Sequence, residues 1–123
     1  MLTVILLMVL TACSRYSSHY RAVAFVHSNE KTSAFMSFSS FEGRMVFRLR
    51  SSGDGEISYT AELGSGDVTV YYDAFGTKEK LFSVSEGEKL SSGGGYVGSG
   101  TVYIIVETDG ECHNGNLHFR LKD

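Results

Sequence analysis

The chain has 123 residues, a formal net charge of −3 and 42% hydrophobic residues, which is the size and composition of one globular domain. Acidic and basic residues are interspersed, which excludes a nucleic-acid-binding protein because that class needs clustered Lys and Arg. Proline is absent and glycine occurs 14 times, so turns have to be formed by Gly, Asn, Asp and Ser.

The N-terminus begins with an uncharged apolar run at positions 1–10 that leads into Leu-Thr-Ala-Cys at positions 10–13. A membrane-spanning helix needs about 20 apolar residues, and Arg15 interrupts this run earlier. The length matches the hydrophobic region of a signal peptide followed by small residues. We therefore expect residues 1–12 to be a signal peptide, the alternative being a buried element of the domain.

This N-terminus resembles that of bacterial lipoproteins, whose signal peptides end in a lipobox of a leucine, two small residues and a cysteine. The resemblance implies that Cys13 receives a diacylglyceryl group and becomes the first mature residue. Two or more acyl chains hold a protein stably at a membrane. Residues 13–19 then form a lipid-anchored tether, whose polar part reaches at most ~20 Å. An extracytoplasmic domain anchored to the cell membrane is the resulting expectation.

From Tyr20 onward apolar residues recur with period two, and no helical period is sustained. A stretch that is apolar on both faces, at 101–107, favours a central strand. The Glu42-Gly43 pair is expected to separate the strand before it from the strand after it. Residues 86–100 are expected to form a long irregular loop. The predicted strands cover 20–27, 34–41, 44–50, 56–63, 67–73, 80–84, 101–107 and a last one containing Leu117, Phe119 and Leu121.

Seven or eight short strands with Gly-rich turns predict an all-β domain over residues 20–123, an antiparallel β-sandwich or jelly roll. Its stretches at 41–49, 103–106 and 115–119 resemble the domain common in small lipoproteins of Gram-positive bacteria. This second resemblance implies a β-sandwich of unassigned activity, because most of those lipoproteins have none assigned.

No motif with catalytic or metal-binding chemistry stands out. The Gly-rich stretch 93–98 has the spelling of a dinucleotide-binding loop, but no helix follows it, as such a loop requires. Cys112, His113 and His118 lack the spacing of a zinc site, and the acidic residues at turns lack that of a calcium loop. No Gly-x-Ser-x-Gly elbow occurs. The sequence therefore predicts no cofactor and a protein that is not an enzyme.

The two cysteines are not expected to form a pair. Acylation of Cys13 leaves Cys112 as the remaining thiol, which is either buried and inert or able to pair between molecules. If Cys13 is not acylated, a disulfide between these two residues is the alternative.

A binding surface is predicted on an outer sheet face. Arg44, Arg48 and Arg50 alternate along one predicted strand as a basic strip, and Tyr71 is expected to point outward from another. Arg can bind anionic polymers or lipid headgroups, and aromatic rings stack on sugars. We expect a non-catalytic binding or structural module whose partner is an envelope polymer or an exported protein. The alternative is a small exported enzyme or enzyme inhibitor that uses the loop 86–100.

Overall fold

The computed structural model describes residues 16–122, which form nine strands and, within that range, no helix. The predicted signal peptide and Cys13 lie outside the described residues. Within these residues no helix is long and apolar enough to cross a membrane. The strands are β1 (His19–Val23), β2 (Val26–Asn29), β3 (Ser33–Ser51), β4 (Gly55–Ser65), β5 (Asp67–Asp73), β6 (Glu79–Ser85), β7 (Lys89–Val97), β8 (Gly100–Thr108) and β9 (Cys112–Lys122).

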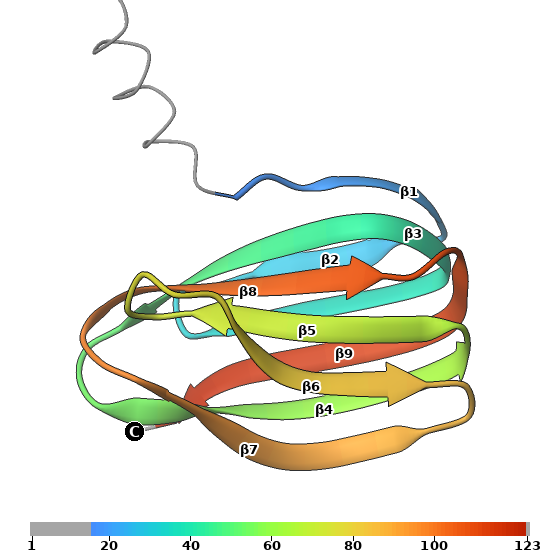
Figure 1. Cartoon of the computed structure of the whole chain (residues 1–123). Helices are drawn as coiled ribbons and strands as arrows, with labels where there is room; N and C mark the ends of the chain where they lie inside the picture. Colours follow the sequence, from blue (N-terminus) through green and yellow to red (C-terminus); the bar gives the residue numbers. More distant parts are fainter. Residues whose placement is uncertain (1–15, 123) are drawn as a thin grey trace, which may run out of the picture.

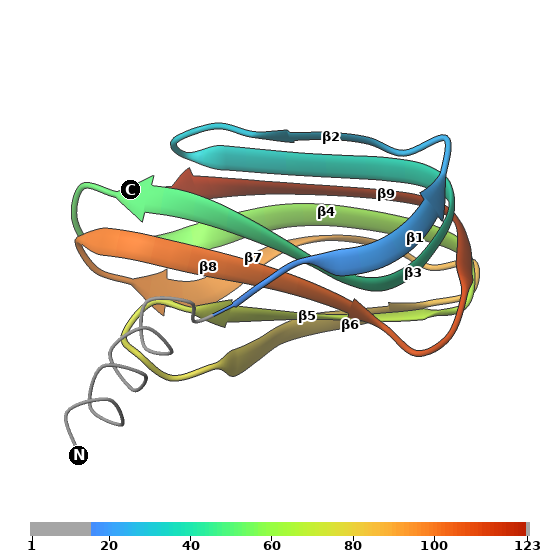
Figure 2. The same ribbon diagram turned by 90° about the horizontal axis from the view of Figure 1, so that it is seen from above.

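The strands form two antiparallel layers that share β3, a strand of 19 residues (Figures 1 and 2). The first half of β3 pairs with β2 and β9, and the second half, from Arg44, pairs with β8. We call the layer of β6, β5, β8, the second half of β3 and β1 the β8 sheet. The β9 sheet consists of β2, the first half of β3, β9, β4 and β7. The predicted all-β sandwich is therefore confirmed.

The predicted break at Glu42-Gly43 is wrong, because the chain bends there and continues as one strand. Gly43 has a φ of 129°, in the region that favours glycine. A Cβ at this position would lie 2.8 Å from the Cα of Tyr20 in β1. The Gly43 amide donates a hydrogen bond to Thr108 Oγ1 at 2.9 Å. Glycine here allows both the bend and the close passage of β1.

The core lies between the two sheets and consists of the side chains that alternate inward along each strand. Phe47 and Ile104 from the β8 sheet and Phe119 from the β9 sheet are fully buried. The rings of Tyr59 and Phe82 stack across the layers with their centroids 4.1 Å apart. Burial of each such side chain contributes about 1.5–3 kcal/mol. β8 is paired on both edges, by β3 and β5, which confirms the predicted central strand.

Two further segments differ from the prediction. The stretch 20–27 splits into β1 and β2, because the chain turns at Ala24, whose φ is 50°. The prediction of a long irregular loop at 86–100 is wrong, since residues 89–97 form strand β7, which pairs with β4. A ladder of backbone hydrogen bonds needs no particular side chains, so a Ser- and Gly-rich sequence can supply an edge strand. The alternative site expected in this stretch would therefore lie on a strand and not on a loop.

Candidate functional site

The glycine-rich strand β7 contains a β-bulge opposite the start of β4. Glu56 pairs with Tyr96 and the next residue, Ile57, pairs with Gly94, so Gly95 is the extra residue. Gly95 has a φ of 70°, and a Cβ there would lie 3.0 Å from the ring of Tyr72. A bulge changes the direction of neighbouring side chains. Tyr96 follows the bulge and is 76% exposed.

Tyr96, Glu56 and Lys122 form a row across three neighbouring strands of the β9 sheet. Glu56 of β4 pairs with Tyr96 of β7 on one side and with Lys122 of β9 on the other. Directly opposed residues place their side chains on the same face, and neighbouring strands are about 4.8 Å apart. The row lies on the outer face, because the adjacent residues Ile57 and Val97 are buried in the core.

Phe75, from the turn between β5 and β6, brings a second ring to this row and is 73% exposed. Its ring lies against Gly98, where a Cβ would be 3.1 Å from Phe75 Cε1 and 4.0 Å from the Asp54 carboxylate. The missing side chain at Gly98 lets the ring of Phe75 lie close to the backbone there. Both rings belong to an open pocket of about 610 Å³, called here the aromatic pocket, which is lined by Asp54, Gly55, Glu56, Phe75, Tyr96, Val97 and Lys122.

The turn that carries Phe75 is held by the buried carboxylate of Asp73, which is 2% exposed. Asp73 Oδ1 accepts a hydrogen bond from the Gly76 amide at 2.8 Å. Asp73 Oδ2 accepts one from the Tyr16 hydroxyl at 2.7 Å. Two independent donors therefore fix this carboxylate, and through it the start of the turn.

Tyr72 and Glu79 close the other side of the same turn. The Tyr72 hydroxyl donates a hydrogen bond to Glu79 Oε2 at 2.9 Å. Burial raises the pKa of Tyr72, and the hydrogen bond and charge of Glu79 raise it further. The phenol therefore stays protonated and remains a donor across the neutral pH range.

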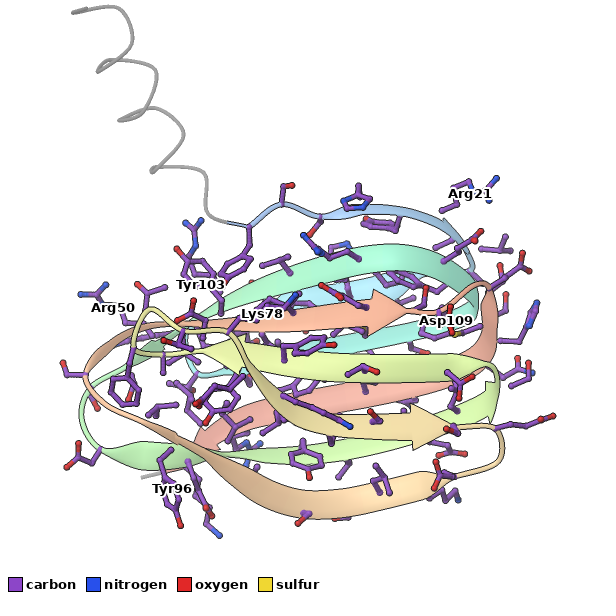
Figure 3. All side chains as sticks on the ribbon, in the orientation of Figure 1. Arg21, Arg50, Lys78, Tyr96, Tyr103 and Asp109 are labelled. Carbon is purple, nitrogen blue, oxygen red and sulfur yellow. The ribbon has the colours of Figure 1, made fainter. Side chains whose placement is uncertain are left out.

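The four residues singled out from the sequence lie on the outer face of the β8 sheet. A guanidinium nitrogen of Arg44 is 2.8 Å from Glu107, and the guanidinium of Arg48 lies 5.6 Å from the centroid of the Tyr103 ring. Arg50 is exposed at the end of β3, and Figure 3 shows it on the same side of the molecule as Tyr103. Tyr71 is half-buried.

Two cations on this face, Arg44 and Lys78, form ion pairs with Glu107 of the same face. The Lys78 ammonium lies 4.4 Å from the centroid of the Tyr71 ring and 2.8 Å from Glu107. Burial alone would raise the pKa of Glu107, but the hydrogen bond and charge of Lys78, together with Arg44, outweigh burial and lower it. The Glu107 carboxylate is thus ionised at neutral pH, and its charge offsets that of Arg44 in the predicted basic strip. Lys78 covers the ring of Tyr71.

Cys112, His113 and His118 do not come together at one site. Cys112 is fully buried, and its thiol donates a hydrogen bond to the Asp67 carbonyl at 3.3 Å. Burial is the main cause that raises the pKa of this thiol, which fits the interpretation of an inert cysteine. His113 instead lies 2.8 Å from Glu111, and His118 lies beside Phe35. Between residues 16 and 122, no three His, Cys, Asp or Glu side chains form a group able to hold a metal ion.

Sequence reasoning missed both rings of the aromatic pocket. Phe75 falls between the predicted strands 67–73 and 80–84, and Tyr96 falls within the predicted loop 86–100, so neither ring is singled out by the sequence. The available signal was the local sequence, because each ring stands next to a glycine, Phe75 beside Gly76 and Tyr96 beside Gly95, where regular inward alternation is interrupted.

Solved structures share this fold. TmCBM61 in complex with β-1,4-galactotriose is similar with a TM-score of 0.52 and 14% identity, over 84% of this chain and 87% of that chain. A mutant of a family 29 carbohydrate-binding module gives 0.44 and 8% identity, over 85% and 89%. A cupin superfamily protein from Desulfitobacterium hafniense gives 0.36 and 15%, over 87% and 79%. No family model matches the chain, and no curated protein matches it. At 14% identity the likeness to TmCBM61 shows the fold alone.

Proposed function

We propose that this protein is a non-catalytic binding module that holds a saccharide chain in the aromatic pocket and is anchored outside the cell membrane by lipid on Cys13. The observation that carries the binding proposal is the pair of exposed rings, Phe75 and Tyr96, that line one open pocket. Large exposed apolar groups that gather at one place are typical of a binding site.

The polar groups of the pocket suit the hydroxyl groups of a sugar. The carboxylates of Asp54 and Glu56 accept hydrogen bonds, and the ammonium of Lys122 donates them. An aromatic ring offers a flat apolar surface to the C–H face of a sugar ring. The fold shared with TmCBM61, which was solved with β-1,4-galactotriose, supports the same ligand class.

The two carboxylates are better placed for holding a sugar than for cleaving it. A glycoside hydrolase keeps one carboxyl group protonated in an apolar environment so that it can act as an acid. Asp54 is exposed and Glu56 is half-buried beside the Lys122 position. We therefore propose binding without hydrolysis.

The anchoring part of the proposal rests on the Leu-Thr-Ala-Cys sequence at positions 10–13. Metabolic labelling with a fatty-acid analogue tests it directly. We expect the label in the wild-type protein and none in Cys13→Ala. Equal labelling of the two proteins, or none in the wild type, contradicts lipidation at this residue.

Calorimetric titration of the full chain with oligosaccharides tests the binding part. The panel contains β-1,4-linked galactose, glucose and mannose oligomers and fragments of cell-wall glycan. We expect at least one of them to bind, and Tyr96→Ala or Phe75→Ala to weaken that binding by at least about tenfold. Tyr71→Ala is the matched control, because it removes an aromatic ring from the other sheet.

The outcomes separate the two surfaces. Loss of binding in Tyr71→Ala with retention in Tyr96→Ala would move the site to the strip predicted from the sequence. A wild-type protein that binds no member of the panel contradicts saccharide binding.

A further inference from the structure

The chain is fixed to the domain from Tyr16 onward. The Tyr16 ring packs edge-on against Tyr103 with their centroids 5.1 Å apart, and its hydroxyl donates to Asp73 at 2.7 Å. Ser18 Oγ accepts a hydrogen bond from the Val46 amide at 2.8 Å. Tyr16 and Ser18, both within the predicted tether, therefore contact the domain directly.

This contact limits the distance between the proposed anchor and the domain. Only Ser14 and Arg15 separate Cys13 from Tyr16 in the sequence. Since an extended residue spans about 3.5 Å, the Cys13 backbone lies within about 10 Å of the Tyr16 backbone. The surface around Tyr16 must then stay near the bilayer.

A groove of about 590 Å³ adjoins Tyr16 and is lined by Tyr16, Ser18, Asn29, Glu30, Lys31, Val46 and Arg48. Three exposed cations lie in this groove or next to it, and we call them the basic face: Lys31, Arg48 and Arg50. Within residues 16–122, none of the three forms an ion pair with a carboxylate. Glu30 is the acidic residue that lines the groove beside them.

The basic face is held in place by the edge of β3. The Asn29 side chain accepts a hydrogen bond from the Arg48 amide at 2.9 Å and donates one to the Arg48 carbonyl at 2.8 Å. The Lys31 carbonyl accepts a hydrogen bond from the Arg50 amide at 2.7 Å. These contacts fasten the turn between β2 and β3 to the second half of β3, so the three cations stay together.

We infer that the basic face docks on the headgroups of anionic phospholipids next to the anchor. This inference rests on the proposed lipidation of Cys13. The free length of about 10 Å is close to one Debye length at physiological salt, so the cations lie within the field of an anionic surface. Guanidinium groups also match the geometry of phosphate oxygens.

Docking in this way sets the orientation of the molecule. Figure 3 shows Arg50 and Tyr103 near the point where the described chain begins, and Tyr96 at the edge of the molecule away from that point. The Tyr96, Glu56 and Lys122 row belongs to the outer face of the β9 sheet. A domain docked through the outer face of the β8 sheet leaves the opposite face, the outer face of the β9 sheet with this row, uncovered.

A distance measurement on the lipidated full chain tests this orientation. A single nitroxide is attached at Thr32→Cys, next to the basic face, or at Asp109→Cys, a labelled position at the opposite end in Figure 3. Acylated Cys13 and buried Cys112 leave the introduced thiol as the reactive one. The protein is placed in vesicles whose headgroups carry gadolinium, made from phosphatidylcholine with or without phosphatidylglycerol.

We expect relaxation by gadolinium to be at least about fivefold stronger at position 32 than at 109 in vesicles with phosphatidylglycerol. The difference should disappear in pure phosphatidylcholine, at high salt and in the triple variant K31Q/R48Q/R50Q. The variant E86Q/E88Q, which alters charge outside the basic face, should keep it.

Equal relaxation at the two positions overturns the inference, as does a difference that persists in the triple variant. Binding of free polyglycerol phosphate by the basic face without vesicle docking also overturns it, in favour of a wall polymer. Mass spectrometry separates the possible failures. A chain without lipid on Cys13 means that the anchor has failed, whereas a lipidated chain that does not orient means that only the docking has failed.

Discussion

The basic face and the aromatic pocket are assembled in different ways. Arg48 and Arg50 are two positions apart on one strand, so simple alternation puts them on the same side. The aromatic pocket collects side chains from the start of β4, the turn after β5, and the ends of β7 and β9. Its construction depends on a bulge at Gly95 and on the missing side chain at Gly98. A surface carried by one strand can be predicted from sequence, whereas a site assembled from turns requires the fold.

The largest expected effect is on saccharide binding, when loss of the aromatic pocket is compared with loss of the basic face. Phe75→Ala combined with Tyr96→Ala should weaken saccharide binding by about a hundredfold or more, because each buried aromatic contact is worth about 2 kcal/mol or more. K31Q/R48Q/R50Q should leave that affinity within about twofold. Calorimetric titration of both variants with the oligosaccharide that binds best measures this. Comparable losses in the two variants would mean that the surfaces are one site.

Asp73 connects the two regions, since it accepts hydrogen bonds from Tyr16 and from the turn of Phe75. Asp73→Ala should lower the free energy of unfolding by about 2–3 kcal/mol, because two donors lose their acceptor. Tyr16→Phe removes one of these bonds and should cost about 1 kcal/mol. Denaturation in urea gives both values. An unchanged stability of Asp73→Ala would show that this carboxylate does not hold the turn.

Gly98 tests the construction of the pocket without removing any ring. In Gly98→Val the new side chain starts 3.1 Å from Phe75 Cε1, so the ring has to move and saccharide binding should fall about tenfold. The backbone at 98 is outside the left-handed region, so little loss of stability is expected. Gly53→Ala is the control, because nothing lies within 4 Å of the added carbon. Equal affinities of these two variants would contradict the proposed position of Phe75.

The smallest effect concerns Glu107 on the β8 sheet, whose pKa is lowered in the folded state. A lowered pKa contributes stability above the unfolded value, near 4.5, and this contribution is lost as the pH falls through the folded pKa. Lys78→Met should therefore reduce stability at neutral pH by less than about 1 kcal/mol. The difference from wild type should shrink as the pH falls below the unfolded value and Glu107 becomes protonated, in contrast with Lys80→Met, which should show no such pH dependence. Urea denaturation at several pH values measures it.

Much of the fold was predictable because alternation reports burial directly. The predicted strand 67–73 matches β5, and apolar residues at alternating positions, such as Phe47 and Phe119, lie inside. Glycine was misinterpreted twice for the same reason. At Gly43 and at Gly93 to Gly95 it signals a bend and a bulge within strands, yet by sequence alone it is equally typical of a turn. Local pattern cannot distinguish these cases, because the neighbour that requires glycine comes from a distant segment, β1 at Gly43 and Tyr72 at Gly95.

The aromatic pocket was not predictable for a related physical reason. Tyr96 and Phe75 are remote from Glu56 and Lys122 in the sequence, and the pairing of β4 with both β7 and β9 brings three of the four into one row. Such pairing is decided by the packing of whole strands and not by the residues of the pocket. The basic strip was predictable in its position, but its neutralisation by Glu107 was not, since that residue comes from the neighbouring strand.

The passage of β3 through both layers has a mechanical consequence. A strand whose backbone is shared leaves no plane along which one layer can slide past the other, and sliding of packed layers is one common way in which proteins transmit binding between remote sites. The two outer faces therefore keep a constant separation whatever occupies either of them. If both proposed surfaces are occupied, this construction would make the molecule a stiff spacer between the two ligands.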